Sequence, residues 1–318
     1  MRLFNQADYQ FIAMRRTTYM LSSIVIALGI ALMVSNVFAL GSWQKYGVDF
    51  TGGSFIQVRF DQPTTAAQLR AALGGANAPP ITRFGEENEF VVRAELTDEE
   101  VAEVADGVRQ QLEAAFGSGV FEIVRQESVG PKIGEELQLK ALLAILFSFV
   151  LTLIYIAIRF EFRFGVAAVI ATFHDILVTL GFLAAFRVEI ALPIVAAILT
   201  IVGYSLNDTI VVFDRVRENL NAKGGRREEP KSLVNRSINE TLPRTVLTSG
   251  TTLGVLLALL FVGGPVIKDF TLVLILGVVI GTYSSIFVAS PALLEIQARF
   301  GDSRSAERRK KRRAANAV

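Results

Sequence analysis

The chain has 318 residues and a net charge of +2, with 52% hydrophobic and only 19% charged residues. Soluble domains carry about 25% charged residues, so this composition excludes an ordinary soluble globule. The chain has no cysteine, which excludes disulfides and thiolate metal sites. The single histidine, His174, excludes histidine-cluster metal sites. We therefore expect no metal, no organic cofactor and no enzymatic activity.

Long apolar runs predict an α-helical polytopic membrane protein with six transmembrane helices. Each run has about 18–25 residues, the length that crosses about 30 Å of hydrocarbon. In chain order the runs are Thr18–Leu40, Leu139–Ile158, Phe164–Phe186, Ile190–Phe213, Arg244–Val262 and Phe270–Leu294. The first run is too long for a signal-peptide core, so we expect an uncleaved anchor.

The insert between the first two runs, residues 41–138, predicts a separate extracytoplasmic domain. Its acidic residues outnumber its basic ones, and it lacks histidine, cysteine and a glycine-rich phosphate loop. Its patterns predict the order β-α-β-β-α-β, a ferredoxin-like fold, and a binding or coupling module. The expected elements are Gly53–Phe60, Thr65–Leu73, Pro80–Phe84, Glu89–Ala94, a helix from a Thr97–Glu100 capping box to Phe116, and Val120–Glu127.

Positive charges in the flanks predict the orientation of the bundle, residues 139–297. With six spans, Arg15, Arg16, Arg159, Arg163 and most of the loop 214–243 fall on one side. Lys and Arg accumulate on the cytoplasmic side, so both termini are expected in the cytoplasm. In the loop, Ser232–Leu242 is weakly amphipathic and reads either as an interfacial segment or as a connector. The basic tail within residues 298–318 is expected to be a solvated segment that sets topology, and contact with anionic lipid or ribosomal RNA is the alternative. For the chain as a whole we expect membrane lipid and no nucleic acid among the partners.

The fourth run carries a carboxylate, Asp208, about 8 Å inside its cytoplasmic end. A charge at membrane depth costs on the order of 3 kcal/mol unless it is neutralised or paired. Arg244 opens the fifth run from the same side, so depth allows the two to meet. Burial favours a neutral carboxyl group and a guanidinium favours a charged one, which is a balance that suits a proton carrier. The alternative is a permanent ion pair that fixes helix register.

Polar residues accompany this pair on both runs. Tyr204 and Asn207 flank Asp208 on one helix face, and Thr248, Ser249, Thr251 and Thr252 follow Arg244. We expect Asn207, Thr248, Ser249 and Thr252 to support the site. The sequences Gly250-x-x-x-Gly254 and Gly277-x-x-x-Gly281 favour close helix packing, although ordinary membrane glycine content explains them nearly as well.

Further charges lie in the third and sixth runs. His174 and Asp175 sit midway along the third run, as either a second proton site or a hydrogen-bonded packing pair. Lys268 and Asp269 lie at the outer end of the sixth run and, taken alone, read as an interfacial pair. Together, Asp269, Asp175 and Asp208 step across the bilayer and suit a proton relay. That ladder is inferred from depth alone.

Five stretches resemble the SecD/SecF family of accessory subunits of the bacterial protein translocase, and its SecF members in particular. They are Val48–Gly53 (VDFTGG), Val129–Pro131, Phe173–Asp175, Gly203–Asn219 (GYSLNDTIVVFDRVREN) and Pro243–Leu253 (PRTVLTSGTTL). The resemblance implies half of a resistance-nodulation-division transporter bundle that pairs with SecD in the cytoplasmic membrane. It also implies a SecYEG channel partner, with YajC and YidC as further candidates, and an unfolded preprotein as substrate.

The resemblance also implies roles for individual residues. Asp208 is the proton-carrying carboxylate, Arg244 its charge partner and Asp269 a further functional charge, whereas the role of His174 and Asp175 is less defined. The implied function is proton-driven late export of preproteins. Two alternatives stay open from the residues: a non-conducting scaffold of the translocase or insertase, and a small-solute exporter. A solute exporter needs a drug-sized pocket that a domain of about a hundred residues hardly accommodates.

Overall fold

The computed structural model describes residues 8–75, 78–84, 88–94, 103–159, 161–222 and 227–299. The predicted capping box Thr97–Glu100 and the basic tail lie outside these residues. The chain divides into two compact units, each described by itself. One unit comprises Met1–Trp43, Phe147–Val188 and Ala196–Val318, and the other comprises Gln44–Leu146 and Glu189–Val195.

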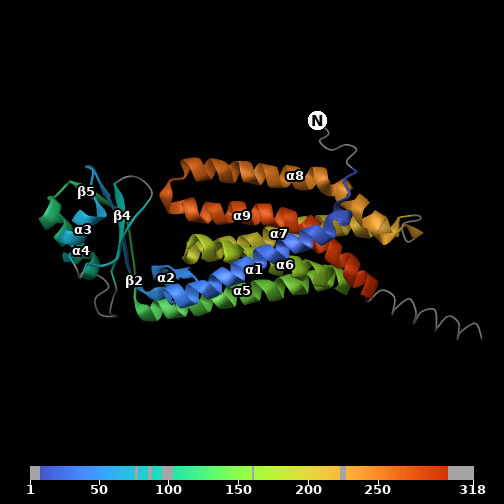
Figure 1. Cartoon of the computed structure of the whole chain (residues 1–318), viewed down its shortest axis with the longest axis horizontal. Helices are drawn as coiled ribbons and strands as arrows, with labels where there is room; N and C mark the ends of the chain where they lie inside the picture. The colour runs from blue at the N-terminus through green and yellow to red at the C-terminus, as the bar shows by residue number, and fades with distance from the viewer. Residues whose placement is uncertain are drawn as a thin grey trace, which may run out of the picture. The chain divides into compact units, whose positions relative to one another are not determined.

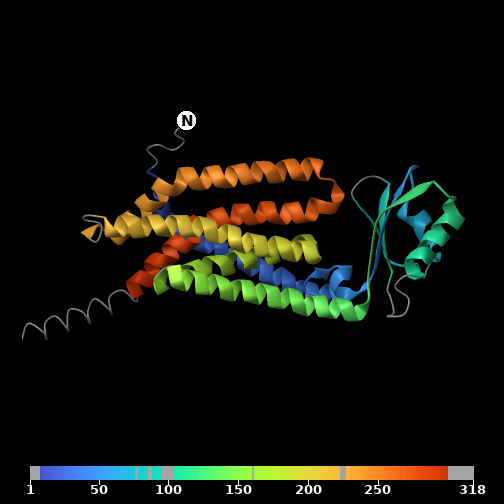
Figure 2. The ribbon, with the colours of Figure 1, turned by 180° about the vertical axis from the view of Figure 1, so that it is seen from behind.

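The described residues contain six helices long and apolar enough to cross a membrane, as predicted. They are α1 (Arg15–Leu40), α5 (Pro131–Arg159), α6 (Phe162–Phe186), α7 (Leu192–Asn221), α8 (Pro230–Val262) and α9 (Lys268–Ser284). After α9 the chain passes through a π-helical turn, η5 (Ser285–Ala289), and remains helical to Arg299. In the bundle, α1 packs along α6 and α8 packs along α9 (Figures 1 and 2).

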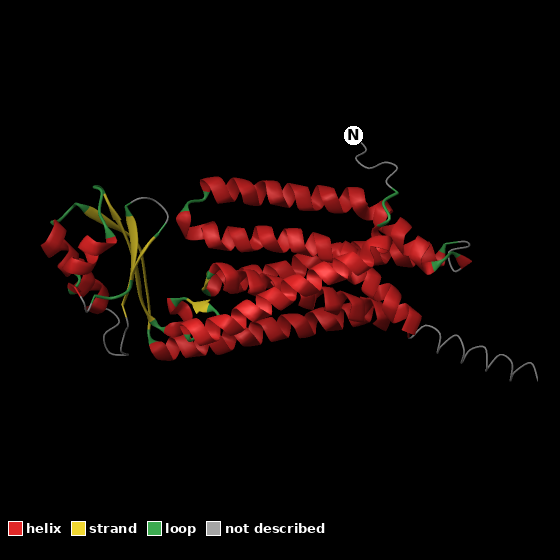
Figure 3. Ribbon diagram, viewed as in Figure 1, coloured by secondary structure: helices red, strands yellow, loops and turns green. Residues whose placement is uncertain are grey.

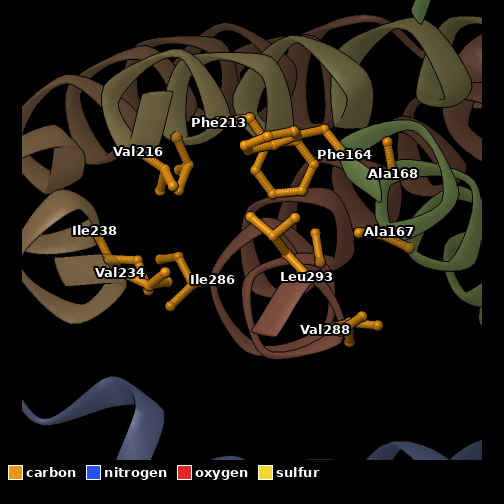
Figure 4. Packing of buried hydrophobic residues seen from close by; sticks show 14 of the residues in the cluster. Phe164, Ala167, Ala168, Phe213, Val216, Val234, Ile238, Ile286, Val288 and Leu293 are labelled. Atoms are coloured by element: carbon orange, nitrogen blue, oxygen red, sulfur yellow. The ribbon is translucent and has the colours of Figure 1, made fainter. Parts of the chain in front are cut away.

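The expected polar loop 214–243 is largely helical, so that prediction is wrong. α7 continues to Asn221, and α8 begins with Pro230 in its first turn, where proline is well tolerated. Pro243 lies inside α8. The apolar side of the Ser232–Leu242 segment is buried in protein. Val234 and Ile238 join a cluster that also contains Phe164, Phe213 and Leu293 (Figure 4). The segment is thus neither an interfacial helix nor a plain connector.

Glycines allow two close helix contacts in the bundle. A Cβ at Gly277 would lie 2.1 Å from the Ile201 side chain, and one at Gly281 would lie 3.0 Å from Ser205, so α9 and α7 approach closely. The predicted Gly277/Gly281 contact is therefore present. Gly250 and Gly254 have no atom near their missing Cβ positions, so the other predicted contact is absent within the described residues. Gly29 and Gly181 bring α1 and α6 together, a contact that the sequence reasoning missed.

The second unit contains a four-stranded antiparallel sheet with two helices on one face (Figure 3). Its elements are β2 (Gly53–Phe60), α3 (Ala66–Ala72), β3 (Ile81–Arg83), β4 (Glu89–Ala94), α4 (Glu103–Phe116) and β5 (Phe121–Val129). The strand order β3-β4-β2-β5 confirms the predicted ferredoxin-like fold. α3 begins with a capping box formed by Thr65 and Gln68. Alternate residues of β2, including Ile56, Val58 and Phe60, supply the core beneath the helices.

The same unit includes small elements that the sequence did not predict. β1 (Lys45–Tyr46) pairs in parallel with β6 (Glu189–Ile190), and α2 (Val48–Thr51) follows β1. Glu189 forms ion pairs with Lys45, at 3.2 Å, and with Arg93 of β4. In the VDFTGG stretch, Gly52 has φ +72° and its missing Cβ would lie 2.8 Å from Pro131. That position therefore requires glycine.

Candidate functional site

Two buried carboxyl groups lie inside the helical bundle, on neighbouring helices. Asp208 of α7 is 2% exposed and Asp175 of α6 is 1% exposed. Ionisable groups inside a membrane bundle are costly and usually mark a functional path. The two carboxyl groups differ in the number and length of the hydrogen bonds that the surrounding helices donate to them.

Among the described residues, Asp208 receives two hydrogen bonds, both long and both from hydroxyl groups. Its Oδ2 accepts from Ser249 Oγ of α8 at 3.3 Å and, at 3.5 Å, from Thr282 Oγ1 of α9, whose one hydroxyl hydrogen also faces the Val278 carbonyl oxygen at 2.7 Å. The Ser249 and Thr282 oxygens are 2.7 Å apart, and Tyr204 Oη donates to Ser249 at 3.3 Å. The carboxyl group thus lies where three helices meet and is loosely coordinated.

Arg244 does not form an ion pair with Asp208, although both residues are described. The guanidinium lies on an exposed position of α8. The expected contact between Asp208 and Arg244 is therefore absent among the described residues. Arg244 and Ser249 point in directions about 140° apart on α8, because five residues turn an α-helix by about 500°.

The other expected supporting residues do not reach Asp208. Thr248 and Thr252 donate to carbonyl groups of their own helix, a common use of threonine in apolar helices. Asn207 is exposed on α7. Only Ser249 of the expected set contacts the carboxyl group. Sequence reasoning missed Thr282, although the polar run Thr282–Ser285 inside an apolar helix was an available signal.

Asp175 is held by three donors from three helices. Its Oδ1 lies 2.8 Å from Nδ1 of His174, and its Oδ2 accepts from Ser284 of α9 at 2.8 Å and from Ser205 of α7 at a shorter distance. Each donor is buried. The structure therefore brings His174 and Asp175 together, as predicted, and adds two serines that sequence reasoning did not single out.

His174 extends this network to α1. Its Nε2 lies 3.0 Å from Ser22 Oγ, and Ser22 Oγ lies 3.1 Å from Tyr283 Oη of α9. Tyr283 Oη donates to the carbonyl oxygen of Thr18 at 3.1 Å. The imidazole also stacks on the Tyr283 ring, with centroids 6.1 Å apart. A continuous chain of polar atoms thus joins α6, α1 and α9.

The two carboxyl sites share α7 and α9. Ser205, which serves Asp175, lies three residues before Asp208, and Thr282, which serves Asp208, lies two residues before Ser284. Asp269 is separate. It is exposed in the first turn of α9, 13 residues and about 20 Å before Thr282 along the helix. The predicted ladder through Asp269 is not connected by any hydrogen bond among the described residues.

The described residues contain no group of three or more His, Asp or Glu side chains suited to a metal ion. What the site offers chemically is a pair of buried acids, one histidine, one tyrosine and several hydroxyl groups. Such groups bind, store and pass protons.

Residues 109–299 match the family described as protein export membrane protein SecD/SecF, C-terminal, and residues 45–64 match the SecD/SecF GG motif. The protein translocase subunit SecF of Gemmatimonas aurantiaca is 46% identical over 310 residues, which cover 94% of this chain and 90% of that protein. SecF of Desulfurispirillum indicum is 44% identical over 294 residues, 90% of this chain and 92% of that protein.

Two solved structures of SecDF overlay with this chain. The crystal structure of SecDF, a translocon-associated membrane protein from Thermus thermophilus, overlays with a TM-score of 0.79 at 39% identity. It covers 94% of this chain, which spans 40% of the SecDF chain. SecDF in a super-membrane-facing form overlays with a TM-score of 0.65 at 37% identity, over 95% of this chain and 40% of the other.

Proposed function

Since the chain belongs to the SecD/SecF family of protein-export membrane proteins, as a multi-pass SecF translocase subunit, we propose that it couples proton movement to preprotein export. In this proposal it pairs with SecD in the bacterial cytoplasmic membrane, with both termini in the cytoplasm. The pair promotes the late stages of export and release of preproteins. It draws on the proton gradient and has neither a cofactor nor an enzymatic activity.

The observation that carries the proposal is the loose coordination of Asp208. A carboxylate with two long hydroxyl bonds and no ion pair is poorly stabilised in its charged form. The charged and the protonated form of Asp208 are therefore close in free energy, and the group can exchange its proton. Asp208 takes up a proton, loses its attraction to Arg244, and lets α7 and α8 relax to a second packing. Release of the proton restores the first packing.

Exposed polar groups on the same helices are evidence that a partner chain covers them. Asn207 of α7 and Arg244 of α8 are exposed polar residues on helices long and apolar enough to cross a membrane, and lipid does not satisfy such groups. A second membrane chain that covers this face would satisfy them, and SecD is the partner that the family provides. SecYEG, YajC and YidC, with the preprotein, are the further partners of the proposal. Asp269 is proposed as an additional charge on the proton route, at the other end of α9.

The test is Asp208→Asn, which keeps the shape of the side chain and removes its titration. We expect export driven by the proton gradient to fall to the level seen without the SecD–SecF pair, with normal complex yield. Asp214→Asn is the matched control, because Asp214 is a partly exposed carboxylate on the same helix that pairs with Arg159. It should retain full export.

The contrary outcome defines the scaffold alternative. If Asp208→Asn lowers the yield of copurified translocase subunits while the surviving complex exports at the normal rate, the acid is structural. Yield and export rate must therefore be measured on the same preparations. A normal rate at normal yield would also end the proton-coupled proposal.

A further inference from the structure

The hydrogen atoms around His174 can be placed by counting donors and acceptors. Tyr283 Oη donates to the Thr18 carbonyl oxygen, which can only accept. A phenol has one hydrogen, so the 3.1 Å contact between Tyr283 Oη and Ser22 Oγ must use the hydroxyl hydrogen of Ser22. Ser22 is thereby a donor to Tyr283.

This assignment decides the state of the imidazole. The single hydroxyl hydrogen of Ser22 is already engaged, yet Ser22 Oγ also lies 3.0 Å from His174 Nε2. That contact is a hydrogen bond only if Nε2 carries a hydrogen and Ser22 accepts it. Another hydrogen lies between Nδ1 and Asp175 Oδ1, which are 2.8 Å apart.

The pair therefore holds one proton more than a neutral imidazole beside a carboxylate. Whether that proton is placed on the ring or on the carboxyl group, the total is the same. Ser205 and Ser284 donate to the other oxygen of Asp175 and stabilise either arrangement. The complete network requires this additional proton.

We propose that His174 and Asp175 form a binding site for one exchangeable proton, and that the hydroxyl group of Ser22 reports whether the site is filled. In the filled state hydrogen bonds run from Nε2 to Ser22, from Ser22 to Tyr283, and from Tyr283 to Thr18. In the empty state the proton has passed to solvent water, Nδ1–H still donates to the Asp175 carboxylate, and Nε2 has a lone pair. Ser22 then turns its hydrogen toward Nε2, and Tyr283 loses that donor.

The neighbours of the pair do not supply a competing charge. Among the described residues in hydrogen-bond or ring contact with it, Tyr283 of α9 is the one titratable side chain, and α1 and α7 contribute Ser22 and Ser205. Asp208 on α7 turns toward Ser249 and Thr282 instead. A change of protonation in the pair thus acts directly on the hydrogen bonds of the neighbouring serine and tyrosine hydroxyl groups.

The position of Tyr283 gives the site a consequence for Asp208. Tyr283 lies between Thr282, which bonds Asp208, and Ser284, which bonds Asp175, two residues before the start of the π-helical turn η5. Such turns are frequent at functional sites. A gain or loss of the Ser22–Tyr283 bond therefore acts on the helix that both acids share. This use rests on the proposed proton-coupled function; the existence of the proton site does not.

The test uses the fact that His174 is the only histidine in the chain. The full chain is produced with ¹⁵N-labelled histidine, placed in lipid nanodiscs, and titrated from about pH 5 to about pH 9 while the two ring nitrogens are observed by NMR. We expect Nε2 to change from protonated to unprotonated within this range, with Nδ1 protonated throughout. A ring that keeps one state at every pH would overturn the proposal.

Two variants test the role of Ser22 as the reporter. Tyr283→Phe keeps the stacked ring and frees the Ser22 hydroxyl to donate to Nε2, so Nε2 should be unprotonated over more of the range, with the midpoint moved by about one pH unit. Tyr155→Phe, an exposed tyrosine on α5, is its control. Ser22→Ala should also move the midpoint, and Ser23→Ala, exposed on the same turn of α1, should not. An unmoved midpoint in both Tyr283→Phe and Ser22→Ala contradicts the proposal.

These readings are separate from export. If the imidazole titrates as expected while Asp208→Asn exports normally, the proton site stands and the proposed function fails. If Asp208→Asn abolishes export while the imidazole never changes state, the proposed function stands and His174 with Asp175 is a fixed hydrogen-bonded pair.

Discussion

The surroundings of Asp208 and Asp175 are built from the same two helices and have opposite character. Asp175 is held by an imidazole and two serines, each on a different helix, through short hydrogen bonds. Asp208 has two hydroxyl donors at 3.3 and 3.5 Å and a guanidinium that stays out of contact. Burial is nearly identical at the two positions.

The difference shows that burial alone does not define what an acid does in a membrane bundle. A carboxylate with several short donors anchors helices, because each donor would be left unsatisfied without it. A carboxylate with few donors contributes little to packing and changes its charge at lower cost. In this chain the densely bonded acid ties α6, α7 and α9 together, and the loosely bonded one lies at the junction of α7, α8 and α9.

The largest effect on stability is expected from Asp175→Ala. The substitution leaves His174 and Ser205 without the acceptor that Asp175 provides, and it leaves Ser284 with the Gly281 carbonyl oxygen at 3.2 Å. It should therefore lower the free energy of unfolding by about 2–4 kcal/mol. Asp208→Ala removes two long bonds together with a buried charge and should change it by about 1 kcal/mol or less. Equilibrium unfolding of the chain in mixed micelles measures both. Equal losses at the two positions would erase the contrast between the sites.

The next effect tests whether the two sites share one scaffold. In Gly281→Ala the added methyl would lie 3.0 Å from Ser205 Cβ and 3.1 Å from its backbone, so α9 and α7 must separate. We expect a loss of about 1–3 kcal/mol in unfolding free energy. Export should fall as well, because both carboxyl groups use α7 and α9.

Gly250→Ala is the matched control for that substitution. No atom lies within 4 Å of the missing Cβ of Gly250, which sits in α8. Alanine favours a helix over glycine by about 1 kcal/mol, so the control should be neutral or slightly stabilising in the same unfolding measurement. A comparable loss at both glycines would show that helix approach between α7 and α9 is not what Gly281 secures.

The smallest effect comes from a carboxyl group that water reaches. The hydrogen bond from Arg236, at 2.7 Å, is the main cause that holds the pKa of Glu228 below its usual value. A lowered pKa in the folded protein means that the stabilisation is complete above the ordinary glutamate pKa of about 4.3 and is lost as the pH falls through the folded value. Glu228→Gln should therefore cost less than about 1 kcal/mol at pH 7, and the cost should shrink as the pH falls through the lowered pKa of Glu228.

Glu229→Gln controls for the charge change at Glu228. Its side chain makes no capping hydrogen bond to α8, so its replacement should leave the unfolding free energy unchanged across the same pH range. Thermal unfolding of the two variants side by side measures the difference. A larger loss at Glu228 than in Asp208→Ala would show that water-exposed pairs outweigh the loosely held buried acid.

Much of the fold was predictable because apolar length and residue alternation are local properties. The six spans and the ferredoxin-like order were predicted from such patterns. The loop 214–243 was predicted wrongly because its charges resemble a solvated connector, whereas its apolar face packs against Phe213 and Leu293. The β1–β6 pair is only two residues long in each strand, too short for any alternation to be read.

The sequence by itself determined which acids are buried, because Asp208 and Asp175 interrupt runs that must cross a bilayer, and it placed His174 beside Asp175. Only the tertiary structure decided their partners. Thr282, Ser284, Tyr283, Ser205 and Ser22 come from three different helices, and no spacing along one helix specifies which face meets which neighbour. That choice depends on helix packing, where Gly277 and Gly281 let α9 approach α7, and therefore on the whole bundle.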